Sequence, residues 1–154
     1  MNNVFVYCEI DKAQVEEVSY ELLTKGRKLA NQLGVQLEAI VAGTDIKGKV
    51  EKEILSYGVD KLHVFDAEGL FPYTSKPHTS ILVNLFKQEK PQICLMGATV
   101  IGRDLGPRVS SSLTSGLTAF CSFCRQSRQF QEPYSQQSSH WWVMMKRADP
   151  GRVL

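Results

Sequence analysis

One stretch decides the fold: Ile93-Cys94-Leu95-Met96-Gly97-Ala98-Thr99-Val100-Ile101-Gly102-Arg103-Asp104. It opens with four apolar residues, the length and composition of a strand buried on both faces of a sheet. Residues 97–102 predict a tight turn, and a helix is expected from about 104 to 115. Asp104 is a suitable N-cap for that helix, which places Pro107 in the first turn, where its missing N–H costs little.

The same alternation of strand and helix extends toward the N-terminus. Apolar stripes at helical spacing predict three more helices, at about 15–33, 50–57 and 79–90. Thr79 is the expected N-cap of the third. Short apolar runs predict strands at 4–8, 37–42, 61–65 and 93–96, with a final strand at 117–121. This alternation implies right-handed βαβ units.

The expected fold class is therefore α/β, with a doubly wound, mostly parallel five-stranded sheet in a three-layer α/β/α, Rossmann-like arrangement. The strands at 4–8 and 93–96 are the most continuously apolar, which favours central positions. The predicted strand order is 61–65, 37–42, 4–8, 93–96 and 117–121, with the last strand at an edge.

The character of the sequence changes after Thr118. Residues 1–119 are predicted to form one domain. Residues 120–154 are rich in Gln and Ser, hold both tryptophans and show no helical stripe. We expect this tail to be poorly ordered, because so polar a segment buries little apolar surface to offset its ordering entropy. Only Trp141–Met145 could form a strand.

Composition and charge exclude several classes of function. The formal net charge is +2, with a balanced body and a small basic excess in the tail. Nucleic-acid binding is not expected, because no broad basic face can form. No apolar run approaches the ~20 residues of a membrane helix. The N-terminus enters a predicted strand without a basic leader, so a cytoplasmic protein is expected.

A crevice should open at the carboxyl ends of the strands at 4–8 and 93–96, lined by Glu9, Asp11 and the 97–104 turn. Phosphate-binding loops occupy such turns between a strand and a helix. A P-loop, however, continues with Lys and then Ser or Thr, whereas Arg103 and Asp104 stand here. Two interpretations remain: a tight turn that needs small residues, or a wall of a nucleotide or partner crevice.

The candidate residues of this crevice, or of a partner interface, come from the first strand end and the turn: Glu9, Gly97, Thr99, Gly102, Arg103 and Asp104. Gly97 should let the chain leave its strand tightly, and Gly102 should let the next backbone approach the strand at 4–8. Arg103 is expected to reach Glu9 or a carboxylate on another subunit.

No catalytic or metal centre is predicted. The three histidines, His63, His78 and His140, lie far apart in the sequence. Cys121 and Cys124 have Cys-x-x-Cys spacing, but a structural zinc site would need two further ligands, and none stands at a suitable spacing. On spacing alone Glu9 and Asp11 could form an acid–base pair, but without further catalytic residues beside them solvated loop carboxylates are the favoured interpretation.

Residues 91–109, followed by Ser115-Gly116-Leu117-Thr118-Ala119, resemble the N-terminal domain of the alpha subunit of electron transfer flavoproteins. In that family the turn and helix read very nearly G-A-T-x-x-G-R-D-L-x-P-R-V, followed by G-L-T-A-D. The resemblance covers about residues 3–119. It implies an electron-carrying alpha–beta heterodimer with FAD, which accepts electrons from dehydrogenases such as acyl-CoA dehydrogenases. The N-terminal alpha domain is then a scaffold, and the C-terminal domain binds FAD.

The chain departs from the family after Ala119, where Phe120 replaces an aspartate. The resemblance therefore implies a truncated alpha subunit whose C-terminal FAD domain is missing. FAD is expected in the heterodimer and not on this chain alone, and no cofactor-binding residue is transferred from the family. The alternative is a nucleotide-binding module of the universal-stress-protein type, which shares the doubly wound architecture.

Overall fold

The computed structural model describes residues 3–121 and 140–145, and the side chains of residues 3–117. Four strands form the parallel part of the sheet: β1 (Val4–Cys8), β4 (Leu37–Gly43), β5 (Lys61–Asp66) and β6 (Ile93–Gly97). Their order is β5-β4-β1-β6, with every pair parallel. The α/β fold class and the predicted order of these four strands are therefore confirmed.

The edge beyond β6 differs from the prediction. In the described residues β8 (His140–Met145) lies between β6 and β7 (Gly116–Cys121), antiparallel to both. The predicted five-stranded order is therefore wrong at this end, because β7 pairs with β8 instead of β6. The strand that the sequence allowed at Trp141–Met145 thus forms as β8 and belongs to the sheet. The predicted poor order of the tail stays a prediction for residues 122–139 and 146–154, which lie outside the described residues.

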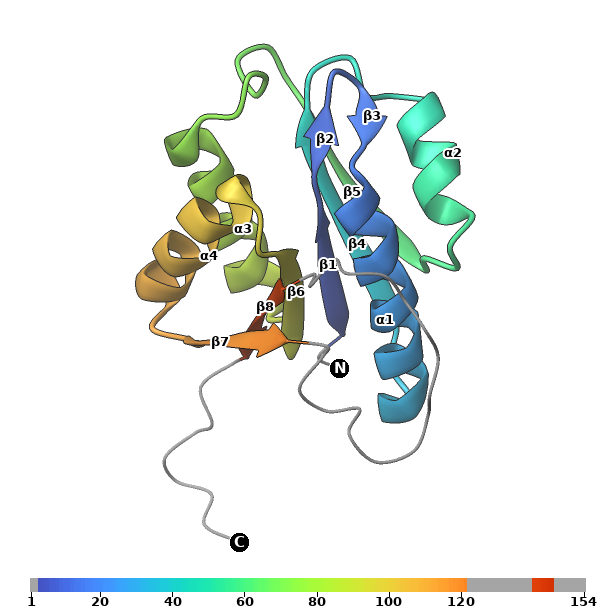
Figure 1. Ribbon diagram of the computed structural model, residues 1–154, viewed down its shortest axis with the longest axis vertical. Coiled ribbons are helices and arrows are strands. Elements are labelled where there is room, and N and C mark those ends of the chain that lie inside the picture. Colours follow the sequence, from blue (N-terminus) through green and yellow to red (C-terminus); the bar gives the residue numbers. More distant parts are fainter. Residues whose placement is uncertain (1–2, 122–139, 146–154) are drawn as a thin grey trace, which may run out of the picture.

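Helices cover both faces of the sheet (Figure 1). One face is covered by α1 (Glu17–Leu33) and α2 (Lys49–Leu55), and the other by α3 (Ser75–Glu89) and α4 (Val100–Leu113). Alternate residues of β1 point to opposite faces, as a pleated strand requires. Val4, Val6 and Cys8 pack on the α1 side, and Phe5 and Tyr7 on the α3 side. All five are buried, so β1 is the centre of the core.

Two helices begin earlier than the sequence predicted. Helix α4 starts at Val100 with Thr99 as its N-cap, and its Oγ1 accepts a hydrogen bond from the Gly102 backbone N–H. The predicted cap at Asp104 is wrong, and Pro107 lies inside the helix instead of in its first turn.

Helix α3 starts at Ser75 with Thr74 as its N-cap, so the predicted cap at Thr79 is also wrong. Thr79 lies within the helix, where its hydroxyl donates a 2.7 Å hydrogen bond to the Ser75 carbonyl. The early start is compatible with Pro77, which then stands in the first turn.

A short hairpin that the sequence did not predict follows β1. It consists of β2 (Ile10–Asp11) and β3 (Gln14–Val15), which pair antiparallel. Both turn residues, Lys12 and Ala13, have positive φ, as a two-residue hairpin turn of this kind requires. The hairpin leads into α1 and borders the carboxyl end of the sheet (Figure 1).

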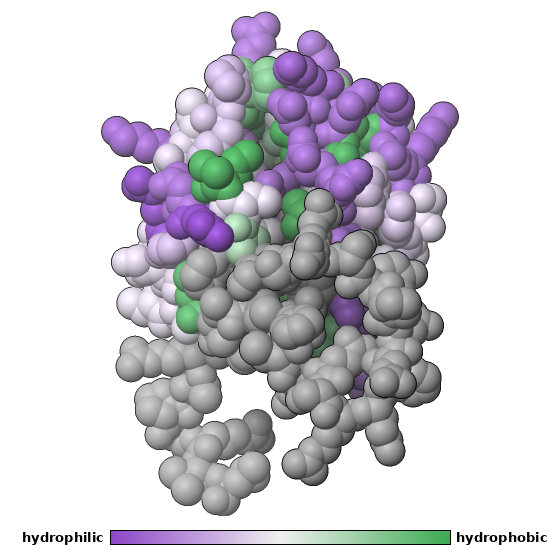
Figure 2. Space-filling model, viewed as in Figure 1, coloured by the Kyte–Doolittle hydropathy of each residue, from purple (hydrophilic) through white to green (hydrophobic). Residues whose placement is uncertain are grey.

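Hydrophilic side chains dominate the upper part of the face seen in Figure 2, with separate hydrophobic spots between them. No helix in the described part of the chain has both the length and the apolar character needed to cross a membrane.

Candidate functional site

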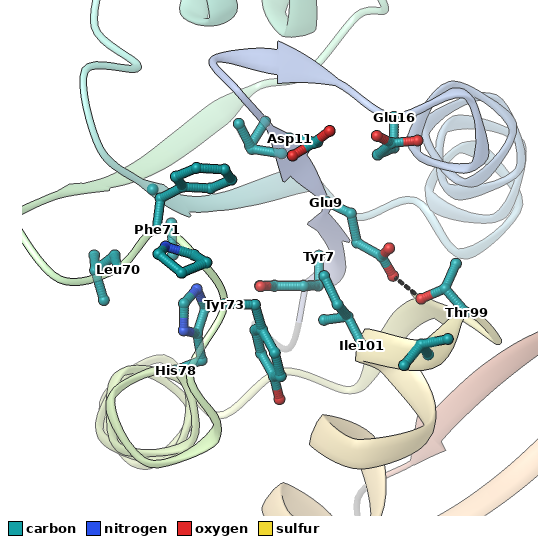
Figure 3. A pocket seen from close by; sticks show the side chains of 15 residues that line it. Tyr7, Glu9, Asp11, Glu16, Leu70, Phe71, Tyr73, His78, Thr99 and Ile101 are labelled. Atoms are coloured by element: carbon teal, nitrogen blue, oxygen red, sulfur yellow. Dashed lines mark hydrogen bonds between the residues drawn. The ribbon is translucent and has the colours of Figure 1, made fainter.

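A crevice of about 440 Å³ opens at the carboxyl ends of β1 and β4, beside the start of α4. The prediction placed this crevice at the carboxyl ends of β1 and β6. Glu9, Asp11 and part of the 97–104 turn line it as expected, but its second strand is β4 and not β6. The lining comes from the β1–β2 region, Glu16, the end of β4, the loop and start of α3, and the 99–101 segment (Figure 3). Their labelled side chains are Tyr7, Glu9, Asp11, Glu16, Leu70, Phe71, Tyr73, His78, Thr99 and Ile101.

Glu9 and Thr99 join two of these segments. Thr99 Oγ1 donates a 2.6 Å hydrogen bond to Glu9 Oε1, drawn as a dashed line in Figure 3. Glu9 is only 3% exposed. Its burial raises the pKa of the carboxyl, the Thr99 hydrogen bond acts in the opposite direction, and the Glu16 charge raises it further. Glu9 is therefore a buried, positioned carboxyl and not a solvated loop carboxylate.

The backbone of Glu9 is held as well. Its N–H donates a 2.8 Å hydrogen bond to Ser19 Oγ, and the Ser19 hydroxyl lies 3.4 Å from the Glu9 carbonyl oxygen. Ser19 is fully buried in the first turn of α1. The end of β1 is thus tied to both α1 and α4, which makes this side of the crevice rigid.

The two glycines of the turn permit a close backbone approach. A Cβ at Gly102 would lie 1.7 Å from the Gly97 carbonyl oxygen, a distance no side chain tolerates. A Cβ at Gly97 would lie 3.1 Å from both Glu9 Oε1 and Val18 Cγ2. Gly102 was predicted to let the backbone approach β1. The closest neighbour of Gly102 is instead Gly97, the last residue of the preceding strand, β6.

Asp104 connects α4 to the loop that enters α3. Its Oδ2 accepts hydrogen bonds from the Tyr73 hydroxyl at 2.8 Å and the Ser75 hydroxyl at 2.5 Å, and its Oδ1 accepts one from Arg108 Nε at 2.8 Å. The hydrogen bonds from Ser75, Arg108 and Tyr73 lower the pKa of Asp104 to about 2. Asp104 therefore stabilises the wall of the crevice and does not cap its helix.

Arg103 does not reach Glu9, contrary to expectation. Its Nε donates a 3.1 Å hydrogen bond to the Ala98 carbonyl, and the side chain is exposed. Glu9 is already occupied by Thr99. Arg103 therefore exposes its guanidinium at the surface of the turn. Its helix neighbour Asp104, in contrast, forms hydrogen bonds within the domain.

The charge of the crevice disfavours a phosphate ligand. Among the residues that the structure describes, its lining contains the acidic residues Glu9, Asp11 and Glu16 and no Lys or Arg. An anion at the start of α4 would meet these acids, which oppose the favourable field of the helix N-terminus. The residues present therefore do not fit the pyrophosphate of FAD.

Sequence reasoning missed the opposite wall of the crevice, formed by Phe71, Tyr73 and His78 (Figure 3). His78 is buried, its Nδ1 lies 2.9 Å from the Thr74 carbonyl oxygen, and its ring lies 4.9 Å from that of Tyr73. Burial lowers the pKa of His78, while hydrogen bonds to the Thr74 and Ala42 carbonyls act in the opposite direction. Pro72 and Pro77 mark this loop in the sequence, but they carry no information on which strand ends it covers.

The other candidates are dispersed. His63 lies on β5 beside Glu38, at the opposite end of the sheet from the crevice. Cys121 ends β7, whereas Cys124 lies outside the described residues. His140 starts β8, and its side chain is not described.

Comparison with known proteins identifies relatives of this arrangement. A family model described as an electron transfer flavoprotein domain matches residues 4–135. Protein FixB of Clostridium saccharobutylicum is 42% identical over 118 residues, covering 77% of this chain and 35% of that protein. The electron transfer flavoprotein subunit alpha of Clostridium acetobutylicum is 41% identical over 118 residues, with the same coverage. The acryloyl-CoA reductase electron transfer subunit beta of Anaerotignum propionicum is 40% identical over 119 residues, covering 77% of this chain and 32% of that protein. The chain thus spans about a third of the length of these relatives.

Proposed function

Because the chain belongs to the electron transfer flavoprotein family, we propose that it acts as the N-terminal domain of an alpha subunit that pairs with a beta-type subunit. The family resemblance inferred from the sequence is thereby confirmed, and the universal-stress-protein alternative is not favoured. In the proposed complex, electrons pass from a dehydrogenase, such as an acyl-CoA dehydrogenase, through FAD. The domain supplies structure and a partner surface, and it carries electrons only as part of the complex.

One observation carries the scaffold role. The family motif at residues 97–108 directs its polar groups into the domain: Thr99 toward Glu9, and Asp104 toward Tyr73, Ser75 and Arg108. Gly97 and Gly102 serve the close packing of the turn. A motif built to bind a cofactor would direct donors outward, as phosphate loops do. We therefore assign Glu9, Gly97, Thr99, Gly102 and Asp104 to the shape of the crevice.

Arg103 is the member of the motif that supports a partner role. Its side chain is exposed, and within the described part of the chain no carboxylate forms an ion pair with it. An exposed guanidinium beside a rigid turn suits a carboxylate on a second subunit, because Arg presents several donors in a fixed geometry. We propose that Arg103 contacts the beta-type subunit.

FAD belongs to the proposed complex, not to the crevice of this domain. The acidic lining that disfavours phosphate supports this assignment. An enzymatic role for the chain itself is not proposed, since Glu9 and His78, the two buried titratable side chains named in the crevice, are tied to structural partners. The cytoplasmic location expected from the sequence stays a prediction.

The test is co-purification of the chain with an electron transfer flavoprotein beta subunit. Wild type should associate, and Arg103→Ala should weaken the association at least about tenfold with an unchanged melting temperature, as for loss of a charged interface contact. Lys52→Ala, which removes an exposed cation from α2 on the other face of the sheet, is the matched control and should bind normally. The chain alone should show no visible flavin absorbance.

Two outcomes contradict the proposal. If wild type fails to associate with any beta subunit tested, the alpha-type role is wrong. If Arg103→Ala binds like wild type, the assignment of Arg103 to the interface is wrong, while the scaffold role stands.

A further inference from the structure

A second group of polar side chains lies at the amino end of the sheet, away from the crevice. Glu38 comes from the start of β4, His63 from β5, and Glu89 from the last position of α3. One ligand atom from each of the three lies within 4.8 Å of the others. Glu38 Oε2 and His63 Nε2 are 2.5 Å apart. Two carboxylates and an imidazole thus converge from three separate elements.

Contacts within the domain orient two of the three candidate ligand side chains, Glu38 and His63. Glu38 is 2% exposed, and Asn3 Nδ2 donates a 2.5 Å hydrogen bond to its Oε1, which leaves Oε2 directed at the cluster. The His63 ring stacks on Phe5 with 5.5 Å between ring centroids, so its orientation is fixed by the core. The side chain of Glu89 is 35% exposed, which leaves the cluster open to solvent on one side.

A cation already pairs with the two carboxylates of the cluster. Lys61 Nζ lies 2.8 Å from Glu89 Oε1 and 3.7 Å from Glu38 Oε2. The Lys61 side chain is 48% exposed and can turn into solvent, unlike Glu38. The two carboxylates and the one ammonium together carry a net charge of −1. A divalent cation in place of the ammonium would bring the ligand set to neutrality.

We propose that Glu38, His63 and Glu89 form a binding site for a divalent transition-metal ion of the zinc class, with Lys61 as the competing internal cation. The donor set decides the class. Imidazole with carboxylate oxygens suits Zn²⁺ or Co²⁺, whereas Ca²⁺ and Mg²⁺ require oxygen ligands in larger number. Water would complete a four-coordinate site on the open side.

The change required for binding is small. Ligand atoms about 2.0–2.2 Å from an ion in tetrahedral geometry stand roughly 3.3–3.6 Å apart. Glu38 Oε2 and His63 Nε2 must therefore separate by about 1 Å, which needs a small shift of these two side chains and no change in the stacking of His63 on Phe5. Asn3 would keep its hydrogen bond to the other oxygen of Glu38 and orient the ligand from outside the coordination sphere.

The experiment titrates the full chain with Co²⁺ and Zn²⁺, by visible absorption and by calorimetry. All variants carry Cys121→Ser, Cys124→Ser and His140→Ala, which removes tail ligands that could bind the same ions. The Co²⁺ complex should show d–d bands without a sulfur charge-transfer band. His63→Ala and Glu89→Gln should each weaken binding at least about tenfold, as loss of a ligand implies.

Lys61→Ala separates the proposal from a plain ion-pair network. Removal of the competing cation should tighten binding about tenfold or more, whereas a purely structural lysine would leave metal affinity unchanged. The control is Lys87→Ala, which removes an exposed cation two residues before Glu89 on α3. It should leave the metal affinity unchanged. The proposal is overturned if the His63→Ala, Glu89→Gln double variant binds Co²⁺ as tightly as its parent, or if Lys61→Ala binds none. Neither result bears on the association with a beta subunit.

Discussion

The Thr99 hydroxyl links Glu9 to the first turn of α4: it donates a 2.6 Å hydrogen bond to Glu9 Oε1, and its oxygen accepts a 3.1 Å hydrogen bond from the Gly102 N–H. One side chain thereby caps a helix and satisfies a buried carboxyl on another element. Thr99 thereby fixes the end of β1 and the start of α4 relative to each other.

Thr99→Val should destabilise the domain by about 2–4 kcal/mol, because it removes an N-cap worth about 0.5–2 kcal/mol and leaves the buried Glu9 carboxyl without a donor at a further cost of about 1–3 kcal/mol. Thr99→Ser retains both hydrogen bonds and should cost less than half as much. Denaturant unfolding of both variants checks the prediction. Equal losses for valine and serine would mean that the methyl group of Thr99, and not its hydroxyl, carries the effect.

Gly102→Ala should destabilise the domain by about 1–3 kcal/mol or more, since its Cβ would lie 1.7 Å from the Gly97 carbonyl and the turn must open. Gly106→Ala is the matched control in the same helix. Its Cβ would approach Leu117 at 3.7 Å and Met96 at 3.9 Å, ordinary contact distances. The control should gain up to about 1 kcal/mol from helix propensity. Thermal melts with opposite shifts for the two variants are expected, and shifts of the same sign would contradict this account of the turn.

The parallel part of the sheet could be predicted because its signals are local. Continuous apolar runs such as Val4–Cys8 belong to strands buried on both faces, and the alternation of strands with helices fixes a parallel arrangement. That order predicted a crevice at the carboxyl end of β1, but it named β6 as the second strand where the structure has β4. The place of β8 could not be predicted, because its pairing with β6 joins residues about fifty positions apart. The apolar run Trp141–Met145 permitted a strand but contained no information on its neighbours.

The helix starts failed for a different reason. Thr99 and Asp104 are both good N-caps by residue type, and only tertiary contacts decide between them. Asp104 is engaged by Tyr73 and Ser75 from a loop that the sequence left unstructured. The cluster of Glu38, His63 and Glu89 was missed similarly, since its members are dispersed along the chain and meet only in the folded sheet.

Asp104 should stabilise the folded domain in a pH-dependent way, with a contribution that is lost in acid. Its folded-state pKa of about 2 lies below the unfolded value near 3.9, so the folded state favours the carboxylate. The stabilisation is present above pH ~4 and is lost as the pH falls from about 4 to about 2. Unfolding free energies of wild type and Asp104→Asn should therefore converge over this range. Ser75→Ala removes one donor and should move the acid transition to higher pH; an unshifted transition would show that Asp104 does not control it.

Glu9→Gln should be neutral or stabilising near pH 7, although it alters one of the most buried polar groups of the domain. The folded-state pKa of Glu9 is raised mainly by burial, so the ionised carboxyl is disfavoured in the folded state. Wild type is therefore more stable below the unfolded pKa near 4.3, and it loses this stability as the pH rises through the folded pKa. Glutamine keeps an oxygen that can accept the Thr99 hydrogen bond and has no charge to bury. The difference in unfolding free energy between the variant and wild type should thus be largest at neutral pH and shrink as the pH falls to about 4.

Glu9→Ala is the contrasting variant. It leaves the Thr99 hydroxyl without an acceptor and leaves a cavity, so it should destabilise the domain at every pH. A Glu9→Gln variant that is strongly destabilised at pH 7 would mean that the carboxylate charge itself stabilises the end of β1, and that burial is not the dominant influence on this group.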